Sequence, residues 1–270
     1  MITLNELDEL LFTIKKQFDY DFCDYSKASM LRRINRFMDI NNMKNAVDLK
    51  FELINNPAIF QNFINEIVVN VSEFFRDPSF FKSLQEKVFP YLNSYPKINI
   101  WSAGCSFGEE TYSLNILLKE NNLFSKTRIY ATDISANAIE RARKGIYDNN
   151  NFKDYTRNYY DCGGKEALNN YFVSDDRHSM IQSELKQNVL FTNHNLVADS
   201  VFKECQLILC RNVLIYFNNE LQNKALELFY ESLPVHGFLA IGKKESLRFS
   251  SIYDNFKEID REEKIYQKIR

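Results

Sequence analysis

The stretch from Ile98 to Ser113 constrains the fold most, because three residue patterns follow one another within it. Apolar residues alternate with polar ones at positions 98–101, as they do in a strand. Mostly small residues follow, ending in Gly108, and leucines recur at helical spacing after Glu109. A strand, a glycine-containing turn and a helix bring backbone amides close to a ligand at the helix N-terminus. This stretch therefore predicts a ligand-binding turn.

The charges on this turn indicate which ligand it can hold. A phosphate loop of the form G-x-x-x-x-G-K-[ST] is absent, and two carboxylates, Glu109 and Glu110, begin the helix instead. Both suit the helix dipole, but they would repel a phosphate. A ligand with positive charge and sugar hydroxyls, such as S-adenosylmethionine, fits better. The alternative is an ordinary strand-to-helix turn with acidic residues at the helix start.

A further acidic residue strengthens the interpretation as a cofactor site. Residues 128–133 read as a second strand that ends in Asp133. In dinucleotide-binding folds an acidic residue at this place binds ribose hydroxyls, and a nucleoside cofactor makes the same demand. Alternatively, Asp133 caps the helix predicted at 135–142, although Ser135 can also fill that role.

Composition restricts the class of protein. The 34 basic and 36 acidic residues nearly balance, so we expect no general affinity for nucleic acid. No apolar run reaches membrane-spanning length and no basic-then-apolar leader opens the chain, so we expect a cytoplasmic protein without direct membrane insertion. The five cysteines form no C-x-x-C pair, which favours reduced thiols, and the three histidines do not cluster into a metal site.

Helical periodicity predicts a small all-helical N-terminal domain at residues 1–69. Its predicted helices occupy residues 3–17, 26–39 and 46–54 and a segment that begins at Pro57.

The second predicted helix, Ser26–Asp39, carries four basic residues and no acidic residue before its end. The basic residues are Lys27, Arg32, Arg33 and Arg36. A solvated basic face is one interpretation. Because the helix supplies no acidic partners for these cations, the other is that it faces an acidic partner surface.

Residues 70–97 are predicted to form a connector followed by a helix that is capped by Asp77. Phe74 and Phe75 are expected to be buried anchors of the connector. The polar residues of the connector are then displayed just ahead of the first strand: Asn70, Ser72 and Arg76. A connector between domains is a common place for a ligand site.

Residues 98–270 are predicted to form an α/β domain. Strands that alternate with helices imply a parallel sheet with ligands at the carboxyl ends of the strands. Residues 147–170 are rich in Asn, Asp, Tyr and Gly and are expected to be irregular. Residues of about 171–186 alternate weakly and predict a small inserted antiparallel sheet, and residues 252–269 can form two closing strands.

Several of these segments together resemble the chemotaxis receptor methyltransferase (CheR) family. Asn70-Val-Ser-Glu-Phe-Phe-Arg-Asp is similar to its N-x-T-x-F-F-R-[DE] segment, and Trp101–Ser113 is similar to its first cofactor motif. Further segments match in order and spacing: Ala131–Ile134, Asn195-Leu196 and Cys210–Phe217. The sequence departs from the family pattern at Ser72, Thr111, residues 235–237 and residues 242–245.

The resemblance implies a Rossmann-like class I methyltransferase sheet with the helical N-terminal domain and the inserted small β subdomain. It implies a monomeric enzyme that transfers a methyl group from S-adenosyl-L-methionine to glutamate side chains on the cytoplasmic helices of chemoreceptors, leaving S-adenosyl-L-homocysteine. The resulting methyl esters would serve chemotaxis adaptation. The receptor would dock along helix Ser26–Asp39 and on the small sheet at 171–186.

Carried over by position, the resemblance implies nine residues that line the cofactor site: Asn70, Ser72, Arg76, Glu109, Asp133, Asn195, Leu196, Arg211 and Asn212. Arg76 and Tyr216 would also be catalytic and face the incoming glutamate. A glutamate carboxylate is ionised at neutral pH and attacks the methyl group directly, so no general base is needed. Arg76 would hold that carboxylate through its planar fork. The alternatives are a salt bridge from Arg76 to Asp77 or Glu73, and a core position for Tyr216.

Two other functions stay open on the sequence alone. One is a non-catalytic module that binds S-adenosylmethionine or its product and docks on a signalling partner. The other is a methyltransferase for a different substrate, such as nucleic acid. The basic helix keeps this last alternative open, although the chain has no broad basic excess.

Overall fold

The computed structural model describes residues 2–18, 20, 22–67, 72–196, 200–201 and 203–270 of the chain. These residues group into two compact units. The first is Met1–Asn70 with Ile215–Asn223, and the second is Val71–Leu214 with Lys224–Arg270.

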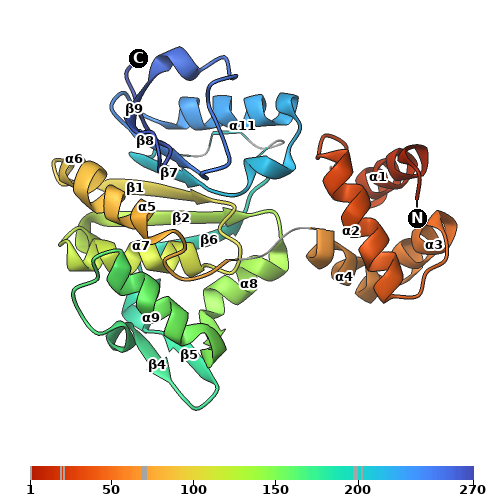
Figure 1. Ribbon diagram of the computed structural model, residues 1–270, viewed down its shortest axis with the longest axis horizontal. Coiled ribbons are helices and arrows are strands. Elements are labelled where there is room, and N and C mark those ends of the chain that lie inside the picture. Colours follow the sequence, from red (N-terminus) through yellow and green to blue (C-terminus); the bar gives the residue numbers. More distant parts are fainter. Residues whose placement is uncertain (1, 19, 21, 68–71, 197–199, 202) are drawn as a thin grey trace. The chain divides into compact units, whose positions relative to one another are not determined.

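Four helices account for most of the described residues of the first unit (Figure 1). They are α1 (Leu4–Phe18), α2 (Lys27–Ile40), α3 (Ala46–Asn55) and α4 (Pro57–Ile67). Their apolar stripes share one core, in which Leu7, Ile34 and Phe63 are fully buried. Asn45 caps α3, because its side chain accepts a hydrogen bond from the amide of Asp48 at 2.9 Å. The helices predicted from periodicity are confirmed.

Two of the four basic residues of α2 have acidic neighbours on other helices, which corrects the expectation that these cations lack such partners. Lys27 pairs with Asp8 of α1 at 2.8 Å, and Arg36 pairs with Glu66 of α4 at 3.2 Å. Arg32 is exposed and has no charged partner among the described residues. Spacing within one helix could not reveal these pairs, because the acidic residues come from other helices.

The first unit also takes in the segment Ile215–Asn223. The amide of Ser26 donates to the carbonyl oxygen of Tyr216 at 2.8 Å. The guanidinium of Arg33 lies over the ring of Tyr216, 5.0 Å from its centroid. Both the backbone and the ring of Tyr216 are therefore held within the first unit.

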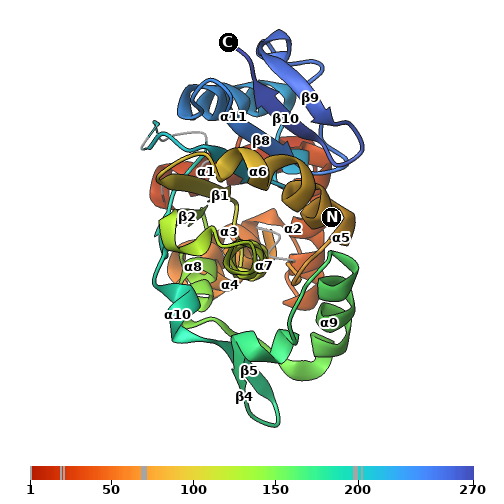
Figure 2. The same ribbon diagram turned by 90° about the vertical axis from the view of Figure 1, so that its left-hand side faces the viewer.

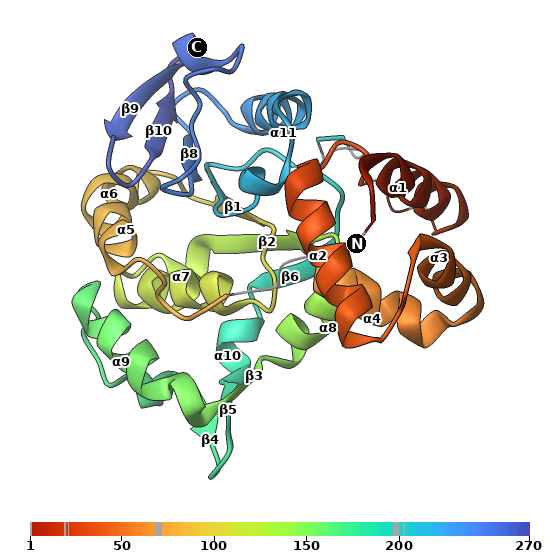
Figure 3. The ribbon, with the colours of Figure 1, turned by 45° about the vertical axis from the view of Figure 1, so that its right-hand side comes forward.

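A seven-stranded sheet forms the centre of the second unit (Figure 3). Its strand order is β6-β2-β1-β7-β8-β10-β9. The strands are β1 (Ile98–Ala103), β2 (Thr127–Asp133), β6 (Val189–Asn193), β7 (Leu207–Cys210), β8 (Phe238–Ile241), β9 (Phe256–Asp260) and β10 (Ile265–Lys268). The first five in spatial order are parallel, and β10 runs antiparallel to both of its neighbours. The predicted Rossmann-like sheet with two closing strands is confirmed.

Helices pack against both faces of this sheet. They are α5 (Pro78–Ser83), the π-helical turn η1 (Leu84–Val88), α6 (Phe89–Leu92), α7 (Glu109–Glu120), α8 (Ala136–Lys144) and α11 (Asn219–Ser232). Successive residues of β1 point to opposite faces. Ile100 joins the core that contains Leu114 of α7, whereas the ring of Trp101 lies 5.3 Å from that of Phe229 in α11.

The small antiparallel sheet is also present, and the insertion is confirmed (Figure 2). It consists of β3 (Ile146–Asp148), β5 (His178–Ile181) and β4 (Phe172–Ser174), in that spatial order. Two of these strands fall in the predicted range of 171–186. The third comes from earlier in the chain, because β3 pairs with β5.

The expectation that residues 147–170 are irregular is wrong, because this segment contains the helix α9 (Phe152–Asp161). Tyr155 and Tyr159 lie one turn apart on α9 and face the buried connector. Their rings lie 5.2 Å from Phe74 and 5.1 Å from Phe75, respectively. Burial of these aromatic rings outweighs the weak helix propensity of a segment rich in Asn, Asp and Tyr.

The described residues also form several short helices. They are η2 (Phe124–Lys126), η3 (Asn149–Asn151), η4 (Leu168–Tyr171), α10 (Ser183–Lys186), η5 (Leu214–Tyr216) and η6 (Tyr253–Asn255). Within the described parts of the chain, no helix has both the length and the apolar character needed to cross a membrane.

Candidate functional site

The candidate site lies at the carboxyl ends of the parallel strands. Ala103 pairs with Thr132, so β1 and β2 end together, and Cys210 pairs with Ile241, so β7 and β8 end together. The chain leaves β1 for β2 on one side, while β7 lies on the other side of β1. A change of direction of this kind opens a ligand crevice in open α/β sheets.

The turn between β1 and α7 runs from Gly104 to Gly108. Its backbone is left-handed at Gly104, Ser106 and Gly108, with φ of +73°, +51° and +92°. The amide of Gly104 donates to the carbonyl oxygen of Thr132 at 2.8 Å, which ties the turn to β2. A Cβ at Gly104 would lie 2.3 Å from Val213. Both the conformation and the packing therefore require glycine at this position.

Asp133 ends β2 and is only 6% exposed. Its Oδ2 accepts a hydrogen bond from the amide of Ser106, and its Oδ1 accepts one from the amide of Ser135, both at 2.9 Å. Burial raises the pKa of Asp133, and these backbone hydrogen bonds oppose the shift. The cap of α8 is Ser135, whose Oγ accepts from the amide of Ala138 at 3.2 Å. Because a carboxylate oxygen can accept two hydrogen bonds, Asp133 can hold the turn and still bind ligand hydroxyls.

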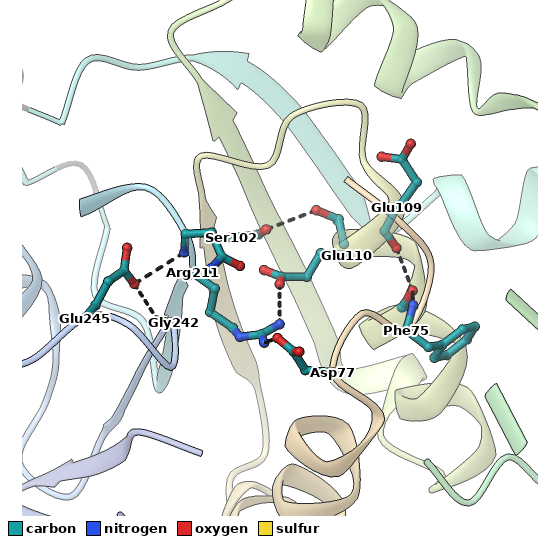
Figure 4. Close-up of polar contacts among 11 residues, drawn as sticks. Phe75, Asp77, Ser102, Glu109, Glu110, Arg211, Gly242 and Glu245 are labelled. Carbon is teal, nitrogen blue, oxygen red and sulfur yellow. Dashed lines mark hydrogen bonds and ion pairs between the residues drawn. The ribbon is translucent and has the colours of Figure 1, made fainter. Parts of the chain in front are cut away.

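The two glutamates that begin α7 point in different directions (Figure 4). Glu110 turns toward Arg211, whereas Glu109 turns away from it. Glu109 is 5% exposed, and its Oε2 has no hydrogen-bond partner among the described residues. Burial raises the pKa of Glu109, while hydrogen bonds, including one from Ser72, and the charge of Arg141 oppose the shift. Such an oxygen is unfavourable in the protein interior unless a ligand supplies a donor.

Two left-handed residues bracket Arg76 in the connector. The φ angle is +53° at Phe75 and +57° at Asp77. This conformation is uncommon outside glycine and costs on the order of 1–3 kcal/mol per residue. The amide of Phe75 donates to Oγ of Ser113 in α7 at 2.9 Å. Phe74 and Phe75 are both fully buried, so their predicted role as anchors is confirmed.

Arg211 follows β7 and joins the connector to α7 (Figure 4). Its Nη2 donates to Oδ2 of Asp77 at 2.5 Å, and its Nη1 donates to Oε2 of Glu110 at 2.8 Å. Its side chain is 1% exposed, and the guanidinium lies 3.9 Å from the ring centroid of Phe80. Asp77 makes no capping bond with its side chain at the start of α5. The predicted helix start is confirmed, because Asp77 occupies the N-cap position and Pro78 the first position of the helix, but the Asp77 carboxylate binds Arg211 and makes no capping bond.

The turn after β7 is fastened to the turn after β8. Asn212 has a φ of +62°, and its amide donates to Oε2 of Glu245 at 3.3 Å. The amide of Gly242 donates to the same oxygen at 2.5 Å. Glu245 is 6% exposed and was not among the predicted site residues. In the sequence, residues 242–245 stand out only as a departure from the family pattern, which gives no sign of this contact.

Asn195 and Leu196 follow β6, which lies beside β2. Asn193 pairs with Asp133 in the sheet, and the amide of His194 donates to the carbonyl oxygen of Asp133 at 3.2 Å. Leu196 is 8% exposed. The two residues predicted after β6 therefore lie at the same edge of the sheet as Asp133.

Most of the predicted site residues belong to the second unit: Ser72, Arg76, Glu109, Asp133, Asn195, Leu196, Arg211 and Asn212. Tyr216 belongs to the first unit, and Asn70 lies outside the described residues. The role of each of these residues toward a ligand stays a prediction.

Two buried polar atoms of the turn suit a nucleoside cofactor with a cationic sulfur. Oε2 of Glu109 and Oγ of Ser106 lack hydrogen-bond partners in the described chain. A carboxylate oxygen accepts from ribose hydroxyls or an ammonium group, and a hydroxyl both donates and accepts. No group of three metal-binding side chains occurs among the residues described. The residues present therefore fit S-adenosylmethionine.

Comparison with known proteins identifies both parts of the chain. Residues 5–68 match the all-alpha domain of CheR methyltransferase, and residues 70–265 match its SAM binding domain.

Relatives extend over nearly the whole chain. Cher3 of Pseudomonas putida, provisionally named a methyltransferase, is 41% identical over 97% of this chain and 96% of its own length. The chemotaxis protein methyltransferase of Listeria monocytogenes is 32% identical over 92% of this chain and 93% of its own length. The protein of the same name from Borreliella burgdorferi is 32% identical over 92% and 90%, respectively. The chain therefore belongs to the CheR methyltransferase family and is an S-adenosylmethionine-dependent methyltransferase.

Proposed function

We propose that the protein transfers the methyl group of S-adenosylmethionine to glutamate side chains on the cytoplasmic helices of chemoreceptors. The products are glutamate methyl esters, which serve chemotactic adaptation. Two relatives named chemotaxis protein methyltransferase, each 32% identical to this chain, support the pathway. The choice of a carboxylate as the acceptor rests on Arg76.

The proposal rests on Arg76, because no described residue engages its guanidinium. The residue is half-buried, and its side chain has no ion pair or hydrogen bond among the described residues. Of its two acidic neighbours, Asp77 is bonded to Arg211 at 2.5 Å, and Glu73 is exposed and makes no ion pair with it. A planar guanidinium holds a carboxylate through two parallel N–H bonds. Arg76 is thus suited to an incoming glutamate.

Methyl transfer requires this chain mainly to align the acceptor carboxylate with the methyl group of the cofactor. The cofactor, when bound, supplies a methyl group activated by its sulfonium. A glutamate carboxylate is already ionised at neutral pH, so no residue has to remove a proton. We assign Arg76 to align the carboxylate, and Glu109 and Asp133 to bind the hydroxyls and amine of the cofactor.

The thiol of Cys105, a possible competing nucleophile beside this site, is kept in its protonated form. Burial raises the pKa of Cys105 well above its usual value, and the charge of Asp133 adds to the shift. The thiol therefore stays protonated at neutral pH, and only a thiolate would attack the methyl group.

The acceptor is proposed to be an acidic helical surface that lies along α2. Arg32 is exposed, and the ion-paired side chains of Lys27 and Arg36 remain 50% and 71% exposed. Complementary charge of this kind steers association and selects partners. The hairpin of β4 and β5, with Val173 59% and Met180 37% exposed, is proposed as a second docking element.

Label transfer tests the proposal. The purified protein is incubated with tritium-labelled S-adenosylmethionine and the membrane fraction of its host, and the methanol released by alkali is counted. Esters release methanol in alkali, whereas N-methyl groups do not. We expect alkali-labile label on chemoreceptor glutamates, located by mass spectrometry of the labelled protein.

The other outcomes support the alternative functions. Cofactor binding without transfer to any fraction supports a non-catalytic signalling module. Alkali-stable label, or label in nucleic acid, supports a different acceptor.

A further inference from the structure

We propose that Arg211 is a positioning residue: its guanidinium clamps the connector to α7 and thereby fixes the backbone that presents Arg76 to the acceptor. This inference rests on the proposed function of Arg76 as the residue that binds the acceptor carboxylate. It gives the Arg211 side chain a task different from the cofactor contact implied by the resemblance.

The clamp uses both arms of the guanidinium. Nη2 donates to Asp77 at 2.5 Å and Nη1 donates to Glu110 at 2.8 Å. The side chain of Arg211 is 1% exposed, whereas Asp77 and Glu110 are 34% and 19% exposed. A buried arginine bonded at both Nη atoms and stacked on Phe80 cannot swing out to a ligand without breaking two ion pairs. Its Nε atom is buried and has no partner among the described residues.

The connector needs such a clamp because its backbone is strained on both sides of Arg76. Phe75 and Asp77 are left-handed, and this conformation persists only where the surroundings hold it. On the N-terminal side, the amide of Phe75 is bound to Ser113 of α7 at 2.9 Å. On the C-terminal side, Arg211 ties Asp77 to Glu110 of α7.

Both ties end on the same helix, which also carries Glu109. Glu109, assigned to the cofactor, lies on α7, and the connector that carries Arg76, assigned to the acceptor, is tied to α7. One rigid helix therefore holds both residues. A fixed separation between them is what direct methyl transfer requires, since misplacing the reacting atoms by about 1 Å can cost on the order of a hundredfold in rate.

Asp77→Asn tests the clamp. Asparagine keeps the shape of aspartate and tolerates the left-handed conformation, but it removes the charge that faces Arg211. With the host membrane fraction as acceptor, we expect kcat to fall about tenfold or more. We expect KM for S-adenosylmethionine and the affinity for S-adenosylhomocysteine to stay within about twofold, because Glu109 and Asp133 are untouched.

Asp260→Asn is the matched control. Asp260 is an aspartate of the same unit that pairs with Lys87 at 2.7 Å and lies outside the site. Its substitution should leave kcat unchanged. Thermal unfolding checks that each variant is folded. If Asp77→Asn does not fold, Glu110→Gln is tested in its place, because it weakens the other ion pair of Arg211.

A double-mutant cycle separates this inference from the function on which it rests. If Asp77 acts through Arg76, Asp77→Asn lowers kcat much less in an Arg76→Lys background than in the wild type. If the losses of kcat from the two substitutions simply multiply in the double variant, the proposed clamp is contradicted. An unchanged kcat for Asp77→Asn alone also contradicts it. Undiminished transfer by Arg76→Ala instead overturns the proposed role of Arg76, whatever the clamp does.

Discussion

The two segments that meet at α7 are held by different forces. The turn between β1 and α7 is fastened by uncharged donors, since the amide of Ser106 binds Asp133 and the amide of Gly104 binds the carbonyl oxygen of Thr132. The connector is fastened by charge, since Arg211 lies between Asp77 and Glu110. We call the turn with Asp133 the cofactor half, and the connector with Arg211 the acceptor half.

This difference separates two kinds of preorganisation. In the cofactor half, backbone donors fix the turn and leave Oε2 of Glu109 buried without a partner among the described residues. In the acceptor half, ion pairs hold a strained backbone while the guanidinium of Arg76 stays unbonded in the described chain. Substitutions in the cofactor half should therefore act on affinity for the cofactor, and those in the acceptor half on the rate of transfer.

The largest effect is expected for Arg76→Ala. Loss of the group that aligns the carboxylate should lower transfer by about a hundredfold to a thousandfold. Affinity for S-adenosylhomocysteine should remain measurable and fall less than about tenfold, because Glu109 and Asp133 remain. Titration calorimetry and the tritium assay measure the two quantities. Arg128→Ala is the control, since among the described residues the Arg128 side chain bonds only to the carbonyl oxygen of Gln187, at the far end of β2. Equal transfer by both variants contradicts the assignment.

Asp133→Ala should show the reverse pattern. It removes the acceptors for the amides of Ser106 and Ser135, which then lie buried without partners. We expect the free energy of unfolding to fall by about 1–3 kcal/mol and cofactor affinity to fall about tenfold. Transfer at saturating cofactor should change less than in Arg76→Ala. Unchanged affinity for S-adenosylhomocysteine argues against the cofactor half as described.

Glu109→Gln should weaken cofactor binding and stabilise the free protein. Burial raises the pKa of Glu109 above its usual 4.5, so at neutral pH its charge destabilises the folded state. The folded state of the wild type regains this stability as the pH falls through the raised pKa, and fully so below 4.5. Denaturant unfolding should thus find the variant more stable at pH 7, with the gap narrowing at pH 4. Affinity for S-adenosylhomocysteine should fall about tenfold at pH 7. A variant less stable than the wild type at pH 7 contradicts this account.

The cofactor half was easier to predict from the sequence than the acceptor half. The turn that begins α7 and the strand that ends in Asp133 could be predicted because a strand, a turn and a helix leave local patterns a few residues long. The roles of Glu109 and Asp133 toward the cofactor stay predictions. The clamp leaves no such pattern, because Asp77 and Glu110 lie 134 and 101 residues from Arg211 in the chain. The family resemblance therefore placed Arg211 in the cofactor site, but nothing in the sequence indicated its ion pairs with Asp77 and Glu110.

The same limit explains the two errors in the fold. Helix α9 was missed because Tyr155 and Tyr159 are buried by connector residues far from them in the sequence. The basic face of α2 was taken as unpaired because Asp8 and Glu66 lie on other helices. Periodicity reports which face of an element is apolar, but it does not report which charged residue meets which.

The smallest effect on activity is expected for Asp260→Asn, which changes an ion pair that does not hold the site. Burial alone would raise the pKa of Asp260, but hydrogen bonds from Lys87 and Ser83 outweigh it and lower the pKa to about 2. Because this lies below the usual 3.8, the contribution of Asp260 to stability is present above pH 3.8 and is lost as the pH falls toward 2. The substitution should lower the free energy of unfolding by up to about 2 kcal/mol at pH 7, and most of this difference should be lost as the pH falls to about 2.

Transfer by Asp260→Asn should match the wild type at a temperature where both are folded. Asp77→Asn and Asp260→Asn each remove one carboxylate charge from an ion pair of the same unit. They differ in that only Asp77 neighbours Arg76 on a strained connector. If both variants lose the same fraction of kcat, ion pairs act on transfer through general stability, and the distinction between the two halves fails. If only Asp77→Asn loses activity while both lose stability, positioning of Arg76 is the remaining cause.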